Sequence, residues 1–120
     1  MRLVAKNISN VHPLVRGAVL DAALAQGITI SDVVGETISL AWEMPYEFSG
    51  SRAVGVESNG SDQFVVRIPQ EMATRIYLIS RSRGLTESSV VQELLADRFG
   101  VEYIPVKRGG TSRRKKEAAS

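Results

Sequence analysis

The chain has 120 residues, of which 43% are hydrophobic and 23% are charged, as in ordinary globular proteins. It has no cysteine, which excludes disulfides, thiolate catalysis and cysteine-based metal sites. It contains no run of about 18 apolar residues, and its first residues lack the apolar stretch of a secretory signal. We therefore expect a cytoplasmic protein that does not span a membrane.

The net charge of +2 is unevenly distributed along the chain. Residues 1–100 carry nine Lys and Arg against eleven Asp and Glu, a balance of −2. Residues 101–120 carry six basic and two acidic residues, a balance of +4. The basic character therefore belongs to the C-terminal end, and taken alone the body lacks the basic excess of a typical nucleic-acid-binding domain.

Residues 1–44 predict a first unit made of a strand and two helices. Residues 2–8 are the strand candidate, and Pro13 suits the first turn of a helix that Gly27 ends. Thr29 or Ser31 caps the next helix. The apolar stripes of the two helices are Leu14, Val15, Val19, Ala22 and Ala23, then Val33, Val34, Ile38 and Trp42.

Residues 45–61 are rich in Gly and Ser without sustained periodicity, which is typical of a linker. A second unit over residues 62–100 follows, and it begins with a short strand at residues 63–68. Alternation in this strand places one set of side chains toward a core and the other toward solvent. The inward set is Phe64, Val66 and Ile68, and the outward set is Gln63, Val65 and Arg67.

The second unit continues with two helices. Pro69 opens the first of these, and Gly84 is suited to end it in a left-handed conformation. Thr86 then caps a helix over residues 87–99. Residues 101–120 hold a short apolar segment and a basic run, for which we expect a disordered tail.

The two units are related by an internal repeat, in which residues 27–42 correspond to residues 84–99. Within this window, six of sixteen positions are identical and three more are close apolar exchanges. The first strand aligns less well, since Asn7 falls on Phe64 when the same offset is kept. We therefore expect an insertion of a few residues before Pro13. The repeat does not determine which side chains of the first strand point outward.

One strand and two short helices cannot bury their apolar stripe alone, whereas two such units can pair their strands over four helices. The strand QFVVRIP, the helix EMATRIYLISRSR, the turn GLTESS and the helix VVQELLADRF resemble the ribbon-helix-helix (Arc/MetJ-type) repressors. The resemblance covers most of the second unit and, more loosely, most of the first. TraY-type proteins show the same tandem fusion. The implied fold is mainly α with a two-stranded antiparallel β-ribbon, the two units forming a pseudo-dimer within one chain.

This resemblance implies a sequence-specific protein that binds double-stranded DNA and regulates transcription, such as a repressor or a phage-encoded regulator, or else a plasmid partition or relaxosome accessory factor. The family places its ribbon in the major groove, where base pairs present distinct donors and acceptors. Arg67 is suited to guanine and Gln63 to adenine. The full set of candidate base contacts is Gln63, Val65 and Arg67 from the second strand, with Arg2, Lys6 and Asn10 from the first.

Phosphate contacts are expected at the start of the second helix of each unit, where free backbone N–H groups and the positive end of the helix point outward. The candidates are Thr29 and Ser31 in the first unit and Thr86, Glu87 and Ser88 in the second. The same residues also form ordinary helix caps. The run Arg113, Arg114, Lys115 and Lys116 either contacts DNA or is a solubilising end.

No residue pattern indicates an enzyme, a cofactor or a metal site, and His12 has no carboxylate pair or cysteine near it in sequence. The alternative function is a protein-interaction module of the same fold, such as an antitoxin or a phage factor that binds a host protein. Pairing of the units within one chain predicts a monomer, with a second molecule beside it on DNA as a further option. Pairing between two chains also stays open.

Overall fold

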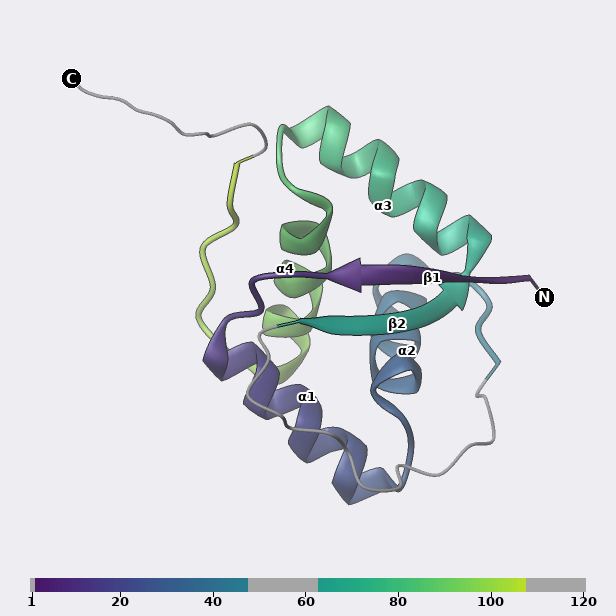
Figure 1. Ribbon diagram of the computed structural model, residues 1–120, viewed down its shortest axis with the longest axis vertical. Coiled ribbons are helices and arrows are strands. Elements are labelled where there is room, and N and C mark those ends of the chain that lie inside the picture. Colours follow the sequence, from purple (N-terminus) through teal and green to yellow (C-terminus); the bar gives the residue numbers. More distant parts are fainter. Residues whose placement is uncertain (1, 48–62, 108–120) are drawn as a thin grey trace.

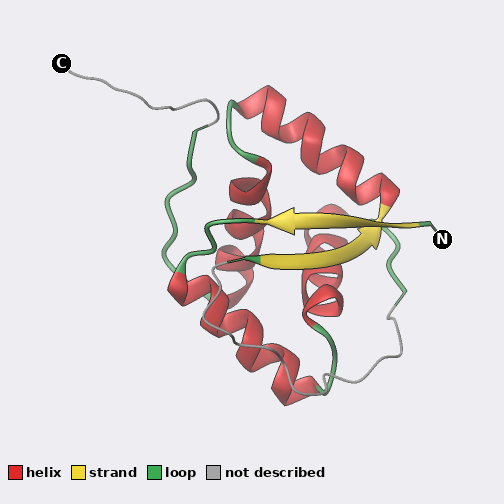
Figure 2. Ribbon diagram, in the orientation of Figure 1, coloured by secondary structure: helices red, strands yellow, loops and turns green. Residues whose placement is uncertain are grey.

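The computed structural model describes residues 2–47 and 63–107. The elements in chain order are strand β1 (Leu3–Ile8), helices α1 (Pro13–Gln26) and α2 (Ile30–Trp42), strand β2 (Phe64–Pro69), and helices α3 (Gln70–Arg83) and α4 (Glu87–Phe99). The described part of the chain is therefore mainly helical, with four helices and one two-stranded antiparallel sheet (Figures 1 and 2). The expected order of strand, helix and helix occurs twice.

The helices begin and end where the local residues require it. Gly27 and Gly84, at φ of 67° and 68°, adopt the left-handed conformation that ends α1 and α3. The hydroxyls of Thr29 and Thr86 each accept a hydrogen bond from the backbone N–H three residues later, over 3.1 and 3.0 Å. The expected caps are therefore confirmed, and of the two candidates for α2 the cap is Thr29.

The two strands pair over their whole length, from Leu3 opposite Pro69 to Ile8 opposite Phe64. They lie side by side, with the four helices packed around and behind them (Figure 1). In β2 the predicted alternation is confirmed, because Phe64, Val66 and Ile68 are buried whereas Val65 and Arg67 are exposed. One face of the sheet thus covers the core and the other faces outward.

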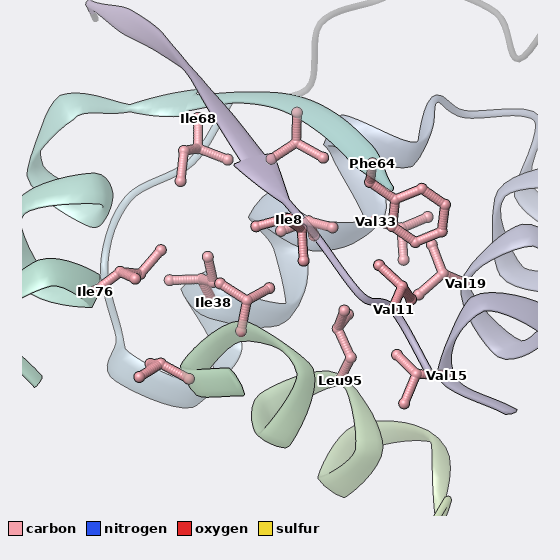
Figure 3. Close-up of a cluster of buried hydrophobic side chains, with 14 of the residues drawn as sticks. Ile8, Val11, Val15, Val19, Val33, Ile38, Phe64, Ile68, Ile76 and Leu95 are labelled. Atoms are coloured by element: carbon pink, nitrogen blue, oxygen red, sulfur yellow. The ribbon is translucent and has the colours of Figure 1, made fainter. Parts of the chain in front are cut away.

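A single hydrophobic core joins the two halves of the chain (Figure 3). It takes side chains from all six elements, among them Ile8, Val19, Ile38, Phe64, Ile76 and Leu95. Equivalent positions of the repeat are buried alike, as Val33 with Val90 and Ile38 with Leu95. Because each half contributes one strand and one helix pair to the same core, neither half closes a core by itself.

The two halves differ between the strand and the first helix. β2 passes directly into α3, whereas residues 9–12 separate β1 from α1. This insertion, which the repeat predicted, is held by Gln92 of α4, a side chain only 1% exposed. Oε1 of Gln92 accepts a hydrogen bond from the backbone of His12 over 2.8 Å, and Nε2 donates to the carbonyl of Asn10 over 3.2 Å.

Each half continues past its second helix with a segment that folds back along that helix. We call residues 43–47 the first strap and residues 101–107 the second strap. Tyr46 of the first strap donates its hydroxyl to a carboxylate oxygen of Asp32 over 2.5 Å. The hydroxyl of Tyr103 in the second strap lies 2.8 Å from Oγ of Ser89. The two tyrosines, like their two partners, occupy equivalent positions of the repeat, so the repeat includes the straps.

The second strap is further fixed at its end. The backbone N–H of Val106 donates to Oγ of Ser89 over 2.7 Å, and the N–H of Thr86 donates to the carbonyl of Val106 over 3.1 Å. Lys107 forms an isolated β-bridge with Leu85. The units therefore extend beyond the boundaries expected at residues 44 and 100. The rest of the expected linker and of the expected tail lies outside the described residues.

Candidate nucleic-acid interface

The outward face of the sheet presents a short row of side chains from both strands. Ala5 lies opposite Arg67, and Asn7 lies opposite Val65. Opposed residues of an antiparallel pair project to the same face, so these four side chains share one surface. Val65 is 68% exposed, and Asn7 and Arg67 are exposed as well. The face therefore combines an amide and a guanidinium with apolar groups, among them Leu3, which is exposed on the same side of β1.

The candidates from the second strand lie where the alternation predicted. Val65 and Arg67 belong to the outward face, and Gln63 is exposed directly before β2. The backbone N–H of Arg67 donates to Oγ of Ser31 over 3.0 Å, which fixes this end of β2 to the start of α2. This hydrogen bond to α2 therefore fixes the part of β2 from which the Arg67 side chain projects.

The candidates from the first strand are placed differently. Lys6 lies opposite Val66, a core residue, and so projects to the inner side of the sheet. There its ammonium group forms an ion pair with the carboxylate of Glu87. Burial lowers the pKa of Lys6. The register therefore separates Lys6 from the outward face that carries Arg67.

Arg2 and Asn10 lie just beyond the two ends of β1. The carbonyl of Arg2 accepts a hydrogen bond from the backbone of Gln70, and the carbonyl of Asn10 accepts one from Gln92. Sequence reasoning missed Asn7, the polar side chain of β1 that does share the outward face. A signal was present, since Val4 and Ile8 are four residues apart and place Lys6 on their own side of the strand.

The first turns of α2 and α4 lie against the two strands of the sheet. Ser31 contacts β2 through the backbone of Arg67, and Oγ of Ser88 donates to the carbonyl of Ser9 over 2.5 Å. Thr29 and Thr86 cap these two helices, and Thr86 and Glu87 line a groove beside β1. Ser88 is buried, and its hydroxyl is bonded to Ser9 and Gln92, so its side chain is not placed for the predicted phosphate contact. Helix starts of this kind carry backbone donors and a partial positive charge.

The two helix starts differ in charge. A groove between β1 and α4 is lined by Ala5, Lys6, Asn7, Ser9, Thr86, Glu87 and Ser88. Glu87 places a carboxylate in this groove, where it neutralises Lys6. At the equivalent position of α2 the residue is Ile30, and Asp32 in the same turn is fully buried and bonded to Tyr46. The exposed start of α2 thus carries no carboxylate, whereas the start of α4 carries one that is paired with Lys6.

The remaining sequence candidates fall elsewhere. Arg113, Arg114, Lys115 and Lys116 lie outside the described residues. His12 caps α1, since its Nδ1 accepts a hydrogen bond from the backbone of Leu14 over 3.1 Å. Among residues 2–47 and 63–107, no group of three or more His, Cys, Asp or Glu is arranged to hold a metal ion.

In the same described ranges, no single helix is long and apolar enough to cross a membrane. α1 and α2 together reach the required length and composition, but they are bent by 102° at the break between them. Scans against models of known protein families, and searches of characterised proteins and of solved structures, gave no match to this chain.

Proposed function

We propose that the chain is a sequence-specific regulator that binds double-stranded DNA, built from two fused ribbon-helix-helix units that pair within one molecule. The observation that carries the proposal is the outward face of the β1–β2 ribbon. It presents Asn7 and Arg67 between the starts of α2 and α4. A two-stranded ribbon fits the major groove of B-DNA, where all four base pairs can be distinguished.

The outward side chains have the chemistry needed to read bases. The guanidinium of Arg67 can donate two hydrogen bonds to O6 and N7 of guanine. The amides of Asn7 and Gln63 can pair with N6 and N7 of adenine, and Val65 can contact the methyl group of thymine. Because the two strands carry different residues at opposed positions, the preferred DNA site is asymmetric.

The starts of α2 and α4 would contact the phosphates on either side of the ribbon. The start of α2 lies beside β2 at Ser31, and the start of α4 lies beside β1 at Thr86 and Glu87. The buried Ser88 side chain is not part of this contact. At the start of α4 the Lys6 ammonium group is already paired with Glu87, so it is not free to bind a phosphate. We therefore assign the stronger phosphate contact to the start of α2.

Selection of bound sequences from randomised duplex DNA tests the proposal. We expect one enriched asymmetric site, and we expect Arg67→Ala and Asn7→Ala each to relax the preference at a separate base pair, by about 1–3 kcal/mol. Arg81→Ala is the matched control, because Arg81 is exposed on α3, away from the ribbon. Retention of the full preference in both ribbon variants would contradict the proposal.

A second candidate function is the protein-interaction module. The observation that favours it is a largely apolar groove on α3, lined by Met44, Thr74, Arg75, Leu78 and Ile79 among others, in which Leu78 is 58% exposed. Exposed apolar grooves on a protein surface are typical of partner sites. If Leu78→Lys abolishes the biological effect while Arg67→Ala preserves it, this second function replaces the first.

A further inference from the structure

The outward face of the ribbon is mostly apolar. Alternation along β1 places Leu3, Ala5 and Asn7 on this face, and Val65 and Arg67 complete it from β2. All five side chains are exposed, Leu3 by 45% and Val65 by 68%. Arg67 is the only charged group among the five, so hydrogen bonds and ion pairs account for only part of what this face can recognise.

The two large apolar side chains of this face lie at different places along the ribbon. Leu3 is opposite Pro69, whereas Val65 is opposite Asn7, four residues further along β1. A strand rises about 3.4 Å per residue, so the two positions are about 14 Å apart. Base pairs of B-DNA follow one another every 3.4 Å or so. Leu3 and Val65 therefore cannot contact the same base pair, and Arg67 lies between them.

An apolar side chain in the major groove meets one kind of apolar group that differs between base pairs. The base edges there present nitrogen and oxygen donors and acceptors, and thymine adds a methyl group at C5. Cytosine has the same group only when it is methylated to 5-methylcytosine. Contact between this methyl group and an exposed Leu or Val removes apolar surface of both partners from water. Leu3 and Val65 are therefore suited to C5-methylated pyrimidines.

We propose that Leu3 and Val65 recognise the C5-methyl groups of two pyrimidines, which lie on either side of the base pair contacted by Arg67. This inference rests on the proposed function and gives it a substrate class. The class is duplex DNA with thymine or 5-methylcytosine at two positions a few base pairs apart. Leu3 and Val65 discriminate by apolar contact, whereas Arg67 discriminates by hydrogen bonds.

Replacement of single thymines by uracil tests the inference, because uracil lacks only the methyl group and still pairs with adenine. Each thymine of the site enriched from randomised DNA is replaced in turn, and the ratio of the two dissociation constants is measured. We expect an affinity loss of about three- to fivefold at two thymines, from about one buried methyl group each. The ratio should be equal at two salt concentrations, because an apolar contact releases no counterions.

Single substitutions connect each methyl group with its side chain. Val65→Ser should bring the ratio to about one at one of the two thymines, and Leu3→Ser at the other. Leu40→Ser is the matched control, because Leu40 is 66% exposed in a groove between the ends of α2 and α4, away from the ribbon. It should leave both ratios unchanged. Each ratio compares two DNAs with the same protein, so it does not depend on the folded fraction of a variant.

Cytosine and 5-methylcytosine, placed in turn at the same two positions, distinguish the two sources of the methyl group. A gain of about three- to fivefold on methylation adds 5-methylcytosine to the substrate class. Equal binding of the two bases restricts the class to thymine.

Failure of the inference differs from failure of the proposed function. If selection enriches no DNA site, the proposed function fails. If a site is enriched but lacks two thymines that respond to uracil, the proposed function stands and recognition of methyl groups is wrong. Uracil losses that persist in both Val65→Ser and Leu3→Ser would also overturn the inference, since the methyl groups would then act without these side chains.

Discussion

The first and second halves of the chain build the same elements from different polar contacts. Their helices have equal lengths, and buried positions such as Ile38 and Leu95 correspond in the repeat. Position 35 is glycine, against which the ring of Tyr46 packs, whereas the equivalent Gln92 holds the insertion before α1. The apolar pattern thus preserves the architecture, while single polar positions adapt each half to its own loops.

The largest effect is expected from Gln92→Ala. The substitution leaves the N–H of His12 and the carbonyl of Asn10 without their partner and removes a bond to Ser88. We expect a loss of about 3 kcal/mol in the free energy of unfolding, measured with urea. Glu93→Ala on the same helix is the control, because its ion pair with Arg83 is exposed to solvent and should contribute little to stability. Equal losses in the two variants would contradict the assigned role of Gln92.

Gly35→Ala tests the packing of the Tyr46 ring against α2 in the first half of the chain. A Cβ at position 35 would lie 2.2 Å from Cε1 of Tyr46, so the ring must move. We expect a loss of about 1–3 kcal/mol in the same assay. In a Tyr46→Ala background the substitution should cost much less, because the obstructing ring is gone. Additive losses in the double variant would show that the ring is not the obstacle.

The two strap tyrosines should differ in strength. Tyr46 bonds a buried carboxylate, whereas Tyr103 bonds a hydroxyl. Bonds to charged groups are the stronger class, so Tyr46→Phe should cost about 2 kcal/mol and Tyr103→Phe about 1 kcal/mol. Thermal unfolding of the two variants at one pH measures this difference. A larger loss of stability in Tyr103→Phe than in Tyr46→Phe would contradict this order.

The smallest effect is a dependence of stability on alkaline pH. Burial, with a hydrogen bond to Asp32, raises the pKa of Tyr46, and burial raises the pKa of Tyr103. Tyrosines of the unfolded chain ionise near pH 10, before the folded ones, so stability should fall as the pH rises above about 10. The lowered pKa of Lys6 has the opposite effect, because the unfolded chain then binds more protons at this side chain and stability rises with pH. Denaturation between about pH 9 and 11 should show a shallower fall in Tyr46→Phe, and an unchanged fall would contradict this.

Much of the fold was predictable because the determinants are local. Gly27 and Gly84 end helices through their own backbone freedom, and Thr29 and Thr86 cap helices within three residues. The alternation of β2 is clear in sequence because Phe64, Val66 and Ile68 are all strongly apolar. These signals require no knowledge of distant partners.

The facing of β1 was not predictable in the same way. Leu3, Val4 and Ala5 are all apolar, so the start of the strand gives no facing, and only the spacing of Val4 and Ile8 indicates that Lys6 projects inward. The register that settles the facing depends on a strand in the other half of the chain. Sequence reasoning therefore selects Lys6 as a base contact and misses the outward Asn7. The straps also escape sequence reasoning because they have no periodicity, although their tyrosines match in the repeat.

The pairing of β1 with β2 has a consequence for synthesis of the chain. β1 is made first, and the partner strand begins at Phe64, with α4 ending only at Phe99. An N-terminal half that leaves the ribosome thus carries an open strand edge and uncovered core residues until the second half is made. Slow translation of the second half should therefore lengthen the interval in which this edge is open to association with other chains.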